Sequence, residues 1–409
     1  MRAPQVLGVP AFRWYFAAMG VSAVGSAMYG LAVTFAVLGL GGSVTQLGVV
    51  LAAGAVPTLL LTLVGGVAGD RIERRSIMIA SDLVMGAVMT VLAVLLISGH
   101  AQIWHFMVGE LVAGCAMAFS GPAAVGLMPT LVTEDLLQSA NSLRYTTWNV
   151  ASVIGPPLAG ILVAAGSTGW ALAANAATYG ASALLMLRLP RSRGRVEAGG
   201  TMLGDLREGW QAFTSRRWVV LMVASFASYQ ATVLPAIFVL GPILAQKHFD
   251  GASSWALVLS ARAVGALVAG ALLFGWRPRK PLVASTALVL LDVPFLVILA
   301  LGLPMPLVVV AAAISAAGVM AADAIWESTL QAGVPGEVLS RVSSYDWFGS
   351  IMINPLGFAL IGAVSGAIGL GPVLVAAMAV QVLVRGALLV SRPIRSVDRP
   401  ERNVVAAVD

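Results

Sequence analysis

Five ionisable side chains lie within long apolar runs of the sequence: Glu110, Arg262, Asp292, Asp323 and Arg385. A charged side chain at the centre of a lipid bilayer costs about 2.5–3.5 kcal/mol or more, so such residues either pair with one another or bind and release ions. Two residues of an antiparallel helical hairpin lie at the same depth when they are equidistant from the connecting loop. Arg262 and Asp292 are equidistant from residue 277, which predicts a buried ion pair between them.

The same construction gives Glu110 no ionisable neighbour, because the residues at its depth in the adjoining hairpins are Met89 and Pro156. A carboxyl group without a partner in apolar surroundings favours its neutral form, so it can take up and release a proton. We therefore expect Glu110 to be the principal proton carrier. The further candidates for proton coupling are Asp292, Arg262 and Asp323. The alternatives are that Glu110 only forms a hydrogen bond to a neighbouring helix and that the ion pair only holds two helices together.

Other kinds of chemistry lack the residues that they need. His100 and His105 are five apart, whereas two histidine ligands on a helix are usually four apart, so we predict no metal site. The one cysteine, Cys115, excludes an intramolecular disulfide and a cysteine metal cage. The sequence has neither a Gly-x-x-x-x-Gly-Lys-Ser/Thr loop nor a His/Asp/Glu cluster. It therefore predicts no ATP-driven pump on this chain, no cofactor and no enzyme.

The elements that must position these residues follow from the composition. Of the 409 residues, 59% are hydrophobic and 10% are charged, whereas soluble domains average about 25% charged residues. A helix needs about 20 apolar residues to cross the hydrocarbon core of a membrane. The chain is therefore predicted to be an all-α polytopic membrane protein with twelve transmembrane helices. The spans are expected at residues 14–38, 44–66, 76–97, 103–126, 143–166, 169–189, 217–244, 252–275, 281–302, 305–330, 345–368 and 371–391.

The basic residues predict the orientation of the chain. Lys and Arg next to a span are retained on the cytoplasmic side, and with twelve spans all of them fall on one side except Lys247, Arg262 and Arg385. We expect a cell-membrane protein with both termini in the cytoplasm. The net charge of +6 reports this topology, and the sequence lacks the basic face with aromatic platforms that nucleic-acid binding requires.

The longest polar stretch, from Arg188 to Arg217, lies at the middle of the chain and separates six spans from six. It divides the chain into an N-terminal six-helix bundle at residues 1–189, a cytoplasmic linker at 190–216 and a C-terminal six-helix bundle with a short tail at 217–409. Apolar residues from Leu203 to Phe213 recur at helical spacing, which predicts an amphipathic helix on the membrane surface. The alternative is a linker helix that only tethers the two bundles.

The two halves of the chain are similar to each other. The connection from Leu136 to Ser142 resembles the stretch from Val338 to Ser344, and Gly155–Gly160 is matched by Asn354–Gly357 in the following helix. Two parallel repeats that rock about a site at the membrane midplane are typical of transporters that work by alternating access. The repeat therefore predicts a transporter with two pseudo-symmetric bundles.

The connection after the second span carries a motif made of Gly66, Asp70, Arg71, Arg74 and Arg75. Its glycines allow helices to approach closely, and its arginines hold the loop in the cytoplasm. The motif resembles the signature of the major facilitator superfamily, Gly-x-x-x-Asp-Arg-x-Gly-Arg-Arg, with Glu73 in place of a glycine. The resemblance implies two six-helix bundles around a central cavity, over about residues 10–395.

In a protein of this family we expect the motif to form a gate. Asp70 is expected to hold the two bundles together at the cytoplasmic side when the cavity faces outward, through the helix start near Ser343 and Ser344. Arg144 is the nearest cation that we expect beside it.

Two further stretches bear on the direction of transport. In the fifth span, Gly155, Pro156 and Gly160 resemble the family's antiporter motif, with alanine in place of two of its glycines. In the family this motif accompanies export driven by proton entry, and an ordinary proline kink is the alternative. The stretch from Trp326 to Ser343 is similar to a branch that includes enterobactin and macrolide exporters, which implies a bulky amphipathic substrate.

These features predict a monomeric secondary active transporter, surrounded by membrane lipids, that exports a hydrophobic or amphipathic small molecule across the cytoplasmic membrane in exchange for protons. By their depth in the helices that line the family's cavity, the candidates for contact with the substrate are Ser26, Tyr29, Glu110, Tyr229 and Gln230. Each could instead be a packed polar residue. The alternatives for the whole chain are a facilitator or proton-coupled importer of a small metabolite and a non-transporting membrane receptor.

Overall fold

The computed structural model describes residues 3–165, 168–190, 202–272 and 278–398. These residues form helices and no strand. The first group of helices is α1 (Ala3–Leu7), α2 (Pro10–Gly39), α3 (Val44–Arg71), α4 (Arg74–Ile97), α5 (Ile103–Leu131), α6 (Glu134–Ala164) and α7 (Thr168–Met186). After α8 (Met202–Thr214) come α9 (Arg217–Pro235), the π-helical η1 (Ala236–Leu240), α10 (Gly241–His248), α11 (Ala252–Leu272), α12 (Pro281–Val289), α13 (Asp292–Ala300), α14 (Met305–Gly333), α15 (Gly336–Ile351), α16 (Asn354–Ile368), α17 (Leu370–Val390) and α18 (Arg392–Arg395).

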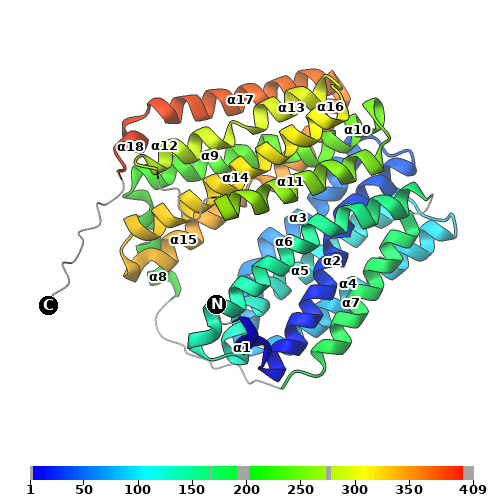
Figure 1. Ribbon diagram of the computed structural model, residues 1–409, viewed down its shortest axis with the longest axis horizontal. Helices are drawn as coiled ribbons and strands as arrows, with labels where there is room; N and C mark the ends of the chain where they lie inside the picture. Colours follow the sequence, from blue (N-terminus) through cyan, green and yellow to red (C-terminus); the bar gives the residue numbers. More distant parts are fainter. Residues whose placement is uncertain (1–2, 166–167, 191–201, 273–277, 399–409) are drawn as a thin grey trace.

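The long helices form two bundles, α2–α7 and α9–α17, which meet at one end of the molecule and diverge at the other (Figure 1). We call the diverging end, which carries α1, α8 and α18, the terminal end. The opposite end, where α2 is followed by α3 and α10 by α11, is the distal end. The all-α fold with two helical bundles was predicted from the sequence and is confirmed.

Eleven stretches of the described residues are helices that are long and apolar enough to cross a membrane. They correspond to all the predicted spans except the one at residues 169–189, which is α7. Helix α7 has 19 residues and carries Asn175, Thr178, Tyr179 and Ser182. It packs against α2 and α4. Its polar side chains therefore lie within the N-terminal bundle, which explains its lower hydropathy.

The connections before the fifth and the eleventh predicted spans are helical. The stretch Leu136–Ser142, predicted to be a connection, lies in α6, and its counterpart Val338–Ser344 lies in α15. Leu136 and Leu137 pack against a buried cluster at the terminal end of the N-terminal bundle, and Val338 and Leu339 pack in the same way in the C-terminal bundle. Apolar packing thus continues both helices beyond the membrane-spanning segments, and the two repeats do so at equivalent positions.

Glycines bring the two bundles together at the distal end. A Cβ atom on Gly160 would lie 2.7 Å from the Cβ of Ala256 in α11, and one on Gly362 would lie 2.7 Å from the carbonyl oxygen of Val44 in α3. The hydroxyl of Thr45 donates a hydrogen bond of 3.0 Å to the carbonyl of Gly362. The last glycine of the predicted antiporter motif therefore contacts the other bundle, and the second repeat has an equivalent contact.

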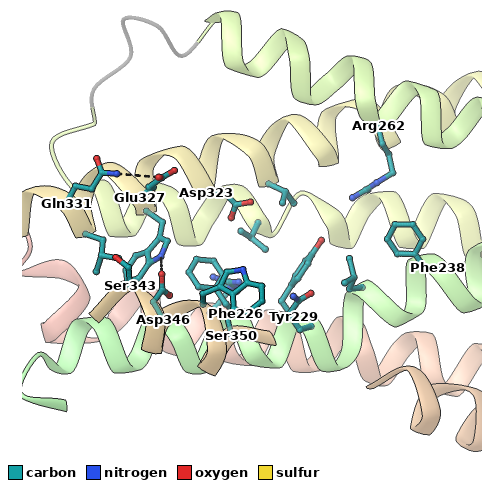
Figure 2. A pocket seen from close by; sticks show the side chains of 18 residues that line it. Phe226, Tyr229, Phe238, Arg262, Asp323, Glu327, Gln331, Ser343, Asp346 and Ser350 are labelled. Atoms are coloured by element: carbon teal, nitrogen blue, oxygen red, sulfur yellow. Dashed lines mark hydrogen bonds between the residues drawn. The ribbon is translucent and has the colours of Figure 1, made fainter. Parts of the chain in front are cut away.

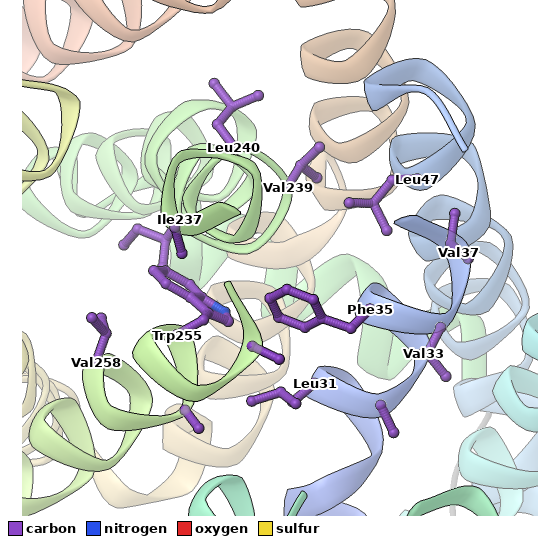
Figure 3. Packing of buried hydrophobic residues seen from close by; sticks show 14 of the residues in the cluster. Leu31, Val33, Phe35, Val37, Leu47, Ile237, Val239, Leu240, Trp255 and Val258 are labelled. Atoms are coloured by element: carbon purple, nitrogen blue, oxygen red, sulfur yellow. The ribbon is translucent and has the colours of Figure 1, made fainter. Parts of the chain in front are cut away.

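Apolar packing completes the distal contact. Phe35 from α2 and Leu47 from α3 belong to the same buried cluster as Trp255 from α11 and Val239 from η1 (Figure 3). Trp255 is 1% exposed. A continuous core therefore joins the bundles at this end, which excludes an opening there in the conformation described.

Part of the predicted linker forms the amphipathic helix α8. Its residues Trp210 and Phe213 pack against Tyr345 of α15, with ring centroids 5.5 and 5.9 Å away. The helix expected from the sequence is present over Met202–Thr214. It is attached to the C-terminal bundle, whereas residues 191–201 lie outside the described part of the chain.

Candidate functional site

A cavity of about 650 Å³ lies in the C-terminal bundle (Figure 2). Helices α9, α14 and α15 supply most of its lining, and η1, α11, α12 and α17 contribute one residue each. Tyr229 and Gln230, which were predicted to face a cavity, line it together with Arg262 and Asp323. Pockets of about 300–1,000 Å³ hold drug-sized ligands. The cavity is therefore large enough for a bulky small molecule.

The part of the cavity toward the terminal end combines acids with aromatic rings (Figure 2). Trp326 donates its indole N–H to Asp346 Oδ2 at 3.0 Å, and the Gln331 amide donates to Glu327 Oε1 at 3.3 Å. Asp323 lies one turn before Glu327 on α14 and is exposed to the cavity. Carboxylates beside aromatic faces suit an organic cation with an apolar body.

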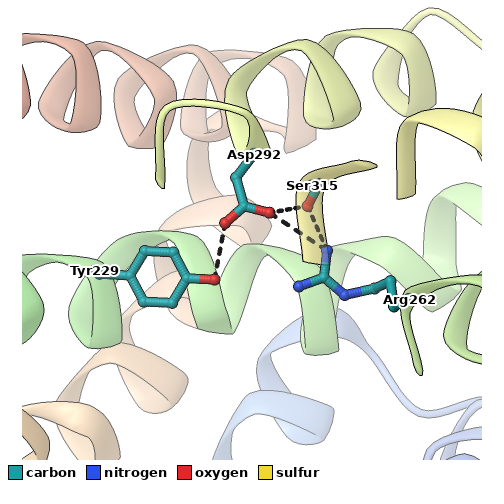
Figure 4. A network of polar contacts seen from close by, with 4 residues as sticks. All are labelled: Tyr229, Arg262, Asp292 and Ser315. Atoms are coloured by element: carbon teal, nitrogen blue, oxygen red, sulfur yellow. Dashed lines mark hydrogen bonds and ion pairs between the residues drawn. The ribbon is translucent and has the colours of Figure 1, made fainter. Parts of the chain in front are cut away.

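A deeper part of the site holds a network of four side chains (Figure 4). Arg262 Nη1 lies 3.3 Å from Asp292 Oδ1, which confirms the predicted ion pair. Arg262 also donates to Ser315 Oγ at 2.7 Å, Ser315 donates to Asp292, and the Tyr229 hydroxyl donates to Asp292 Oδ2 at 2.9 Å. The network thus connects α9, α11, α13 and α14 around one carboxylate.

A break between α12 and α13 places Asp292 in this network. Pro294 has no N–H and its ring clashes with the carbonyl of Leu290, so the helix is interrupted there. Asp292 is consequently the first residue of α13. The positive end of a helix favours a carboxylate at that position.

Arg385 of α17 lies beside the same cavity and is completely buried. Its guanidinium carbon is 5.3 Å from the centroid of the Phe226 ring. Within the described part of the chain, none of its three guanidinium nitrogens has a hydrogen-bond partner. Arg385 therefore adds a positive charge, without a described hydrogen-bond partner, to the cavity that Asp323 and Arg262 also line.

Glu110 lies in the N-terminal bundle, away from the residues that line the cavity, and is 8% exposed. The Tyr29 hydroxyl donates to Glu110 Oε1 at 2.7 Å, and Ser26 is 2.9 Å from the hydroxyl of Tyr179. The expectation that Glu110 has no charged partner at its own depth is consistent with this geometry. The alternative expectation, a hydrogen bond to a neighbouring helix, also agrees with it, since Tyr29 of α2 is the donor. Three predicted cavity residues, Ser26, Tyr29 and Glu110, thus belong to contacts inside this bundle.

The motif between α3 and α4 is described only in part, because the side chains of residues 66–71, which include Gly66, Asp70 and Arg71, lie outside the description. Arg74 donates to the carbonyl of Gly126 at 2.7 Å. Arg75 donates to the carbonyls of Met186 and Leu187 at 2.9 and 2.6 Å, and the Arg144 guanidinium lies over the Tyr145 ring. Arg74 and Arg75 therefore bind helix ends of their own bundle, and the contact expected of Asp70 stays a prediction.

The first two residues of the predicted antiporter motif lie inside the N-terminal bundle. Gly155 packs so closely on Ala27 of α2 that a Cβ atom there would overlap it. Pro156 lies within α6, which continues to Ala164. The motif thus places one glycine against α2 and the next, Gly160, against the other bundle.

The interpretation of the sequence overlooked several polar residues inside the two bundles. Asp82 and Asp346 lie in membrane-spanning stretches and would have been found by the same search that selected Glu110. Tyr179 and Ser315 are uncharged, and their contacts join helices that are not neighbours in the sequence. Hairpin depth cannot predict such contacts.

The comparisons with known proteins agree with the fold. The family model of the Major Facilitator Superfamily matches residues 15–352. The macrolide efflux protein A of Streptococcus pyogenes is 23% identical over 267 residues, 64% of this chain and 66% of that protein, so the chain covers just under two thirds of that relative. The enterobactin exporter EntS of Salmonella typhi is 28% identical over 287 residues, 68% of this chain and 67% of that protein.

Among solved structures, that of the nucleoside transporter NupG superposes with a TM-score of 0.74 at 12% identity and covers 92% of this chain and 98% of that one. This similarity concerns the fold. A family model matches most of the length of the chain, and the chain has the helical two-bundle architecture. The chain therefore belongs to the Major Facilitator Superfamily of transporters.

Proposed function

We propose that this transporter exports a hydrophobic or amphipathic small molecule, such as a drug, siderophore or other natural product, across the cell membrane in exchange for protons. The relatives named for macrolide efflux and enterobactin export support the direction. The basic residues support an orientation in which the terminal end faces the cytoplasm. In that orientation the described conformation is open toward the cytoplasm and closed toward the outside.

The observation that carries the proposal is the composition of the cavity. It presents Asp323, Glu327 and Asp346 beside the rings of Trp326 and Trp347, so it suits an amphipathic molecule with a cationic group. Tyr229 and Gln230 contact the substrate deeper in the cavity. Protons enter at Glu110, and the Arg262–Asp292 pair and Asp323 provide further charges that respond to occupancy.

The distal contacts and the motif between α3 and α4 supply the two gates. Rocking of residues 1–189 against residues 217–409 separates Gly160 from Ala256 and Gly362 from Val44, which opens the distal end. At the same time Asp70 comes to α15 near Ser343 and closes the terminal end. The helix start expected near Ser343 and Ser344 was wrong, because α15 begins at Gly336 and Ser343 lies seven residues further on. Two similar bundles that alternate in this way give exchange without a continuous channel.

The test is transport in proteoliposomes that contain the purified full chain. Labelled erythromycin and labelled enterobactin are the probes, and an imposed pH difference is the driving force. We expect the probe to move against the direction of proton flow. The compartment that the probe leaves should therefore become more acidic. Transport of probe in the same direction as protons would instead support the importer, and binding of probe without flux would support a receptor.

Orientation is tested separately in a background in which Cys115 is replaced. A cysteine introduced at Gly194 in the linker should react only from the cytoplasm, and one at Gly251 between α10 and α11 only from outside. Labelling of both positions from outside would overturn the proposed topology.

A further inference from the structure

A second carboxylate, Asp82 of α4, lies in the N-terminal bundle and has no function in the mechanism so far. It is partly buried, and the hydroxyl of Ser182 in α7 donates to its Oδ2 at 2.6 Å. Helix α4 packs against α7 along its length. Gly86, one turn after Asp82, also faces α7, since a Cβ there would be in ordinary contact with the Cβ of Tyr179 at 3.5 Å. Asp82 is therefore held against the polar face of α7.

The next contacts lead from α7 to α2 and from α2 to α5. Tyr179, one turn before Ser182, has its hydroxyl 2.9 Å from Ser26 Oγ. Tyr29, one turn after Ser26, donates to Glu110 at 2.7 Å. Three hydrogen-bonded pairs thus follow one another through α4, α7, α2 and α5, with a carboxylate at each end and hydroxyl groups between.

Each join between two pairs runs along one helix. Ser182 and Tyr179 are three residues apart on α7, as are Ser26 and Tyr29 on α2, so the two members of each join lie on the same helix face. Bridging water between the hydroxyl groups would complete each join. Both Asp82 and Glu110 act electrostatically on the Tyr179 phenol, and Tyr179 acts on Tyr29. These are the titratable groups that face the chain of hydroxyls from the packed helices in the described part of the bundle.

The two carboxylates lie at different depths. The connection between α4 and α5 centres near residue 100, so Glu110 is level with residue 90 of α4. Asp82 is then about 12 Å nearer the terminal end, at a rise of about 1.5 Å per residue. The chain of hydroxyls therefore runs along the membrane normal from the terminal side toward the buried carboxylate.

We propose that Asp82, Ser182, Tyr179, Ser26 and Tyr29 form a proton path that connects Glu110 with the terminal side of the molecule, separate from the substrate cavity in the other bundle. The proposal rests on the proposed function of Glu110 as proton carrier. Protonated Asp82 gives its proton to the Ser182 end of the chain, each hydroxyl passes one proton on as it receives another, and Tyr29 delivers one to the Glu110 carboxylate. One proton moves from Asp82 to Glu110, and every hydroxyl ends neutral.

The test follows protonation of Glu110 directly, without a substrate. The purified full chain in lipid nanodiscs is subjected to a rapid pH jump, and the carbonyl stretch of protonated Glu110 is followed by time-resolved infrared spectroscopy. The band is assigned by its loss in Glu110→Gln. We expect Tyr179→Phe, which removes one oxygen and keeps the ring, to slow the appearance of the band by about 100-fold at an unchanged final amplitude. Ser26→Ala should slow it as well.

The matched control is Tyr15→Phe, since Tyr15 is a buried tyrosine of α2 outside the chain of hydroxyls. It should leave the rate unchanged. A wild-type rate in Tyr179→Phe, or no protonation band from Glu110, overturns the proton path. Erythromycin flux in proteoliposomes separates a failure of the proton path from a failure of the proposed function. If the wild type moves erythromycin without protons, proton exchange fails and the infrared rates still decide the path. If proton coupling persists undiminished in Tyr179→Phe, the path alone fails.

Discussion

Replacement of Asp292 by asparagine should destabilise the C-terminal bundle, because it leaves the charge of Arg262 without a counter-charge in contact. Asp292 is 1% exposed and forms its ion pair with Arg262 at 3.3 Å. The same carboxylate accepts hydrogen bonds from Tyr229 and Ser315. The amide of asparagine can replace part of the hydrogen bonding but none of the charge.

The size of the effect follows from the burial of the pair. Removing one partner of a buried ion pair costs about 3–5 kcal/mol. The Arg262 side chain is 14% exposed and lines the cavity, so water can stabilise its charge after Asp292 is replaced. The lower end of that range therefore applies. A loss of about 3 kcal/mol corresponds to a fall in melting temperature of about 6–12 °C for a unit of 150–250 residues.

Thermal unfolding of the purified protein in detergent, followed by tryptophan fluorescence, measures this effect. The Asp292→Asn variant should lose the full amount, and the double replacement Asp292→Asn with Arg262→Gln should recover at least half of it, because no charge is then stranded. Asp346→Asn is the matched control, since Asp346 accepts a hydrogen bond from Trp326 that asparagine can also accept. A double variant no more stable than Asp292→Asn, or a single variant that melts with the wild type, would refute the reasoning.

Three further outcomes are expected. Glu110→Gln, which resembles the protonated side chain, should abolish proton-driven efflux of erythromycin, while the affinity for erythromycin changes less than about threefold. The coupling site would instead be the Asp292 and Arg262 pair if Glu110→Gln pumps normally and the double variant of that pair folds but does not couple to protons. Gly362→Leu should separate the bundles at the distal end, because its Cβ would meet the backbone of Val44, and a cysteine at Gly251 should then react faster with reagents from outside than it does without that substitution. Gly371→Leu, where nothing lies within 4 Å, is the control and should leave that rate unchanged. Asp70→Asn should lower transport at unchanged expression, measured as erythromycin flux per molecule, and an undiminished flux would show that the motif only sets topology.

The fold could be predicted from the sequence because crossing a membrane imposes a length and a polarity on each helix. The exceptions have local causes. Helix α7 is less apolar because Asn175 and Tyr179 face neighbours in the bundle. The stretch Leu136–Ser142 contains polar residues typical of a connection, but its leucines pack on a buried cluster and keep it helical. Helix ends beyond the membrane depend on such tertiary contacts, which hydropathy alone does not contain.

The sites could be predicted only where hairpin geometry applies. Arg262 and Asp292 were paired correctly because α11 and the broken helix α12–α13 are consecutive and antiparallel, so counting residues gives depth. Tyr29 and Glu110 lie on α2 and α5, which are not consecutive, and their hydrogen bond depends on how the bundle packs. A count along the chain has no information about that packing, although the presence of an acid such as Asp82 in a spanning helix was visible.

Each bundle contains a tyrosine that donates a hydrogen bond to a buried carboxylate, although the two carboxylates lie in helices that do not correspond in the two repeats, α5 and α13. Tyr29 in the first helix of one bundle and Tyr229 in the first helix of the other each donate a hydrogen bond to a buried carboxylate, Glu110 and Asp292. In the C-terminal bundle that carboxylate also forms an ion pair with Arg262 at 3.3 Å. In the N-terminal bundle the described side-chain contact of Glu110 is the hydroxyl of Tyr29, which carries no charge. A single arginine thus distinguishes the ion-paired carboxylate beside the substrate cavity from the carboxylate that we propose to carry protons.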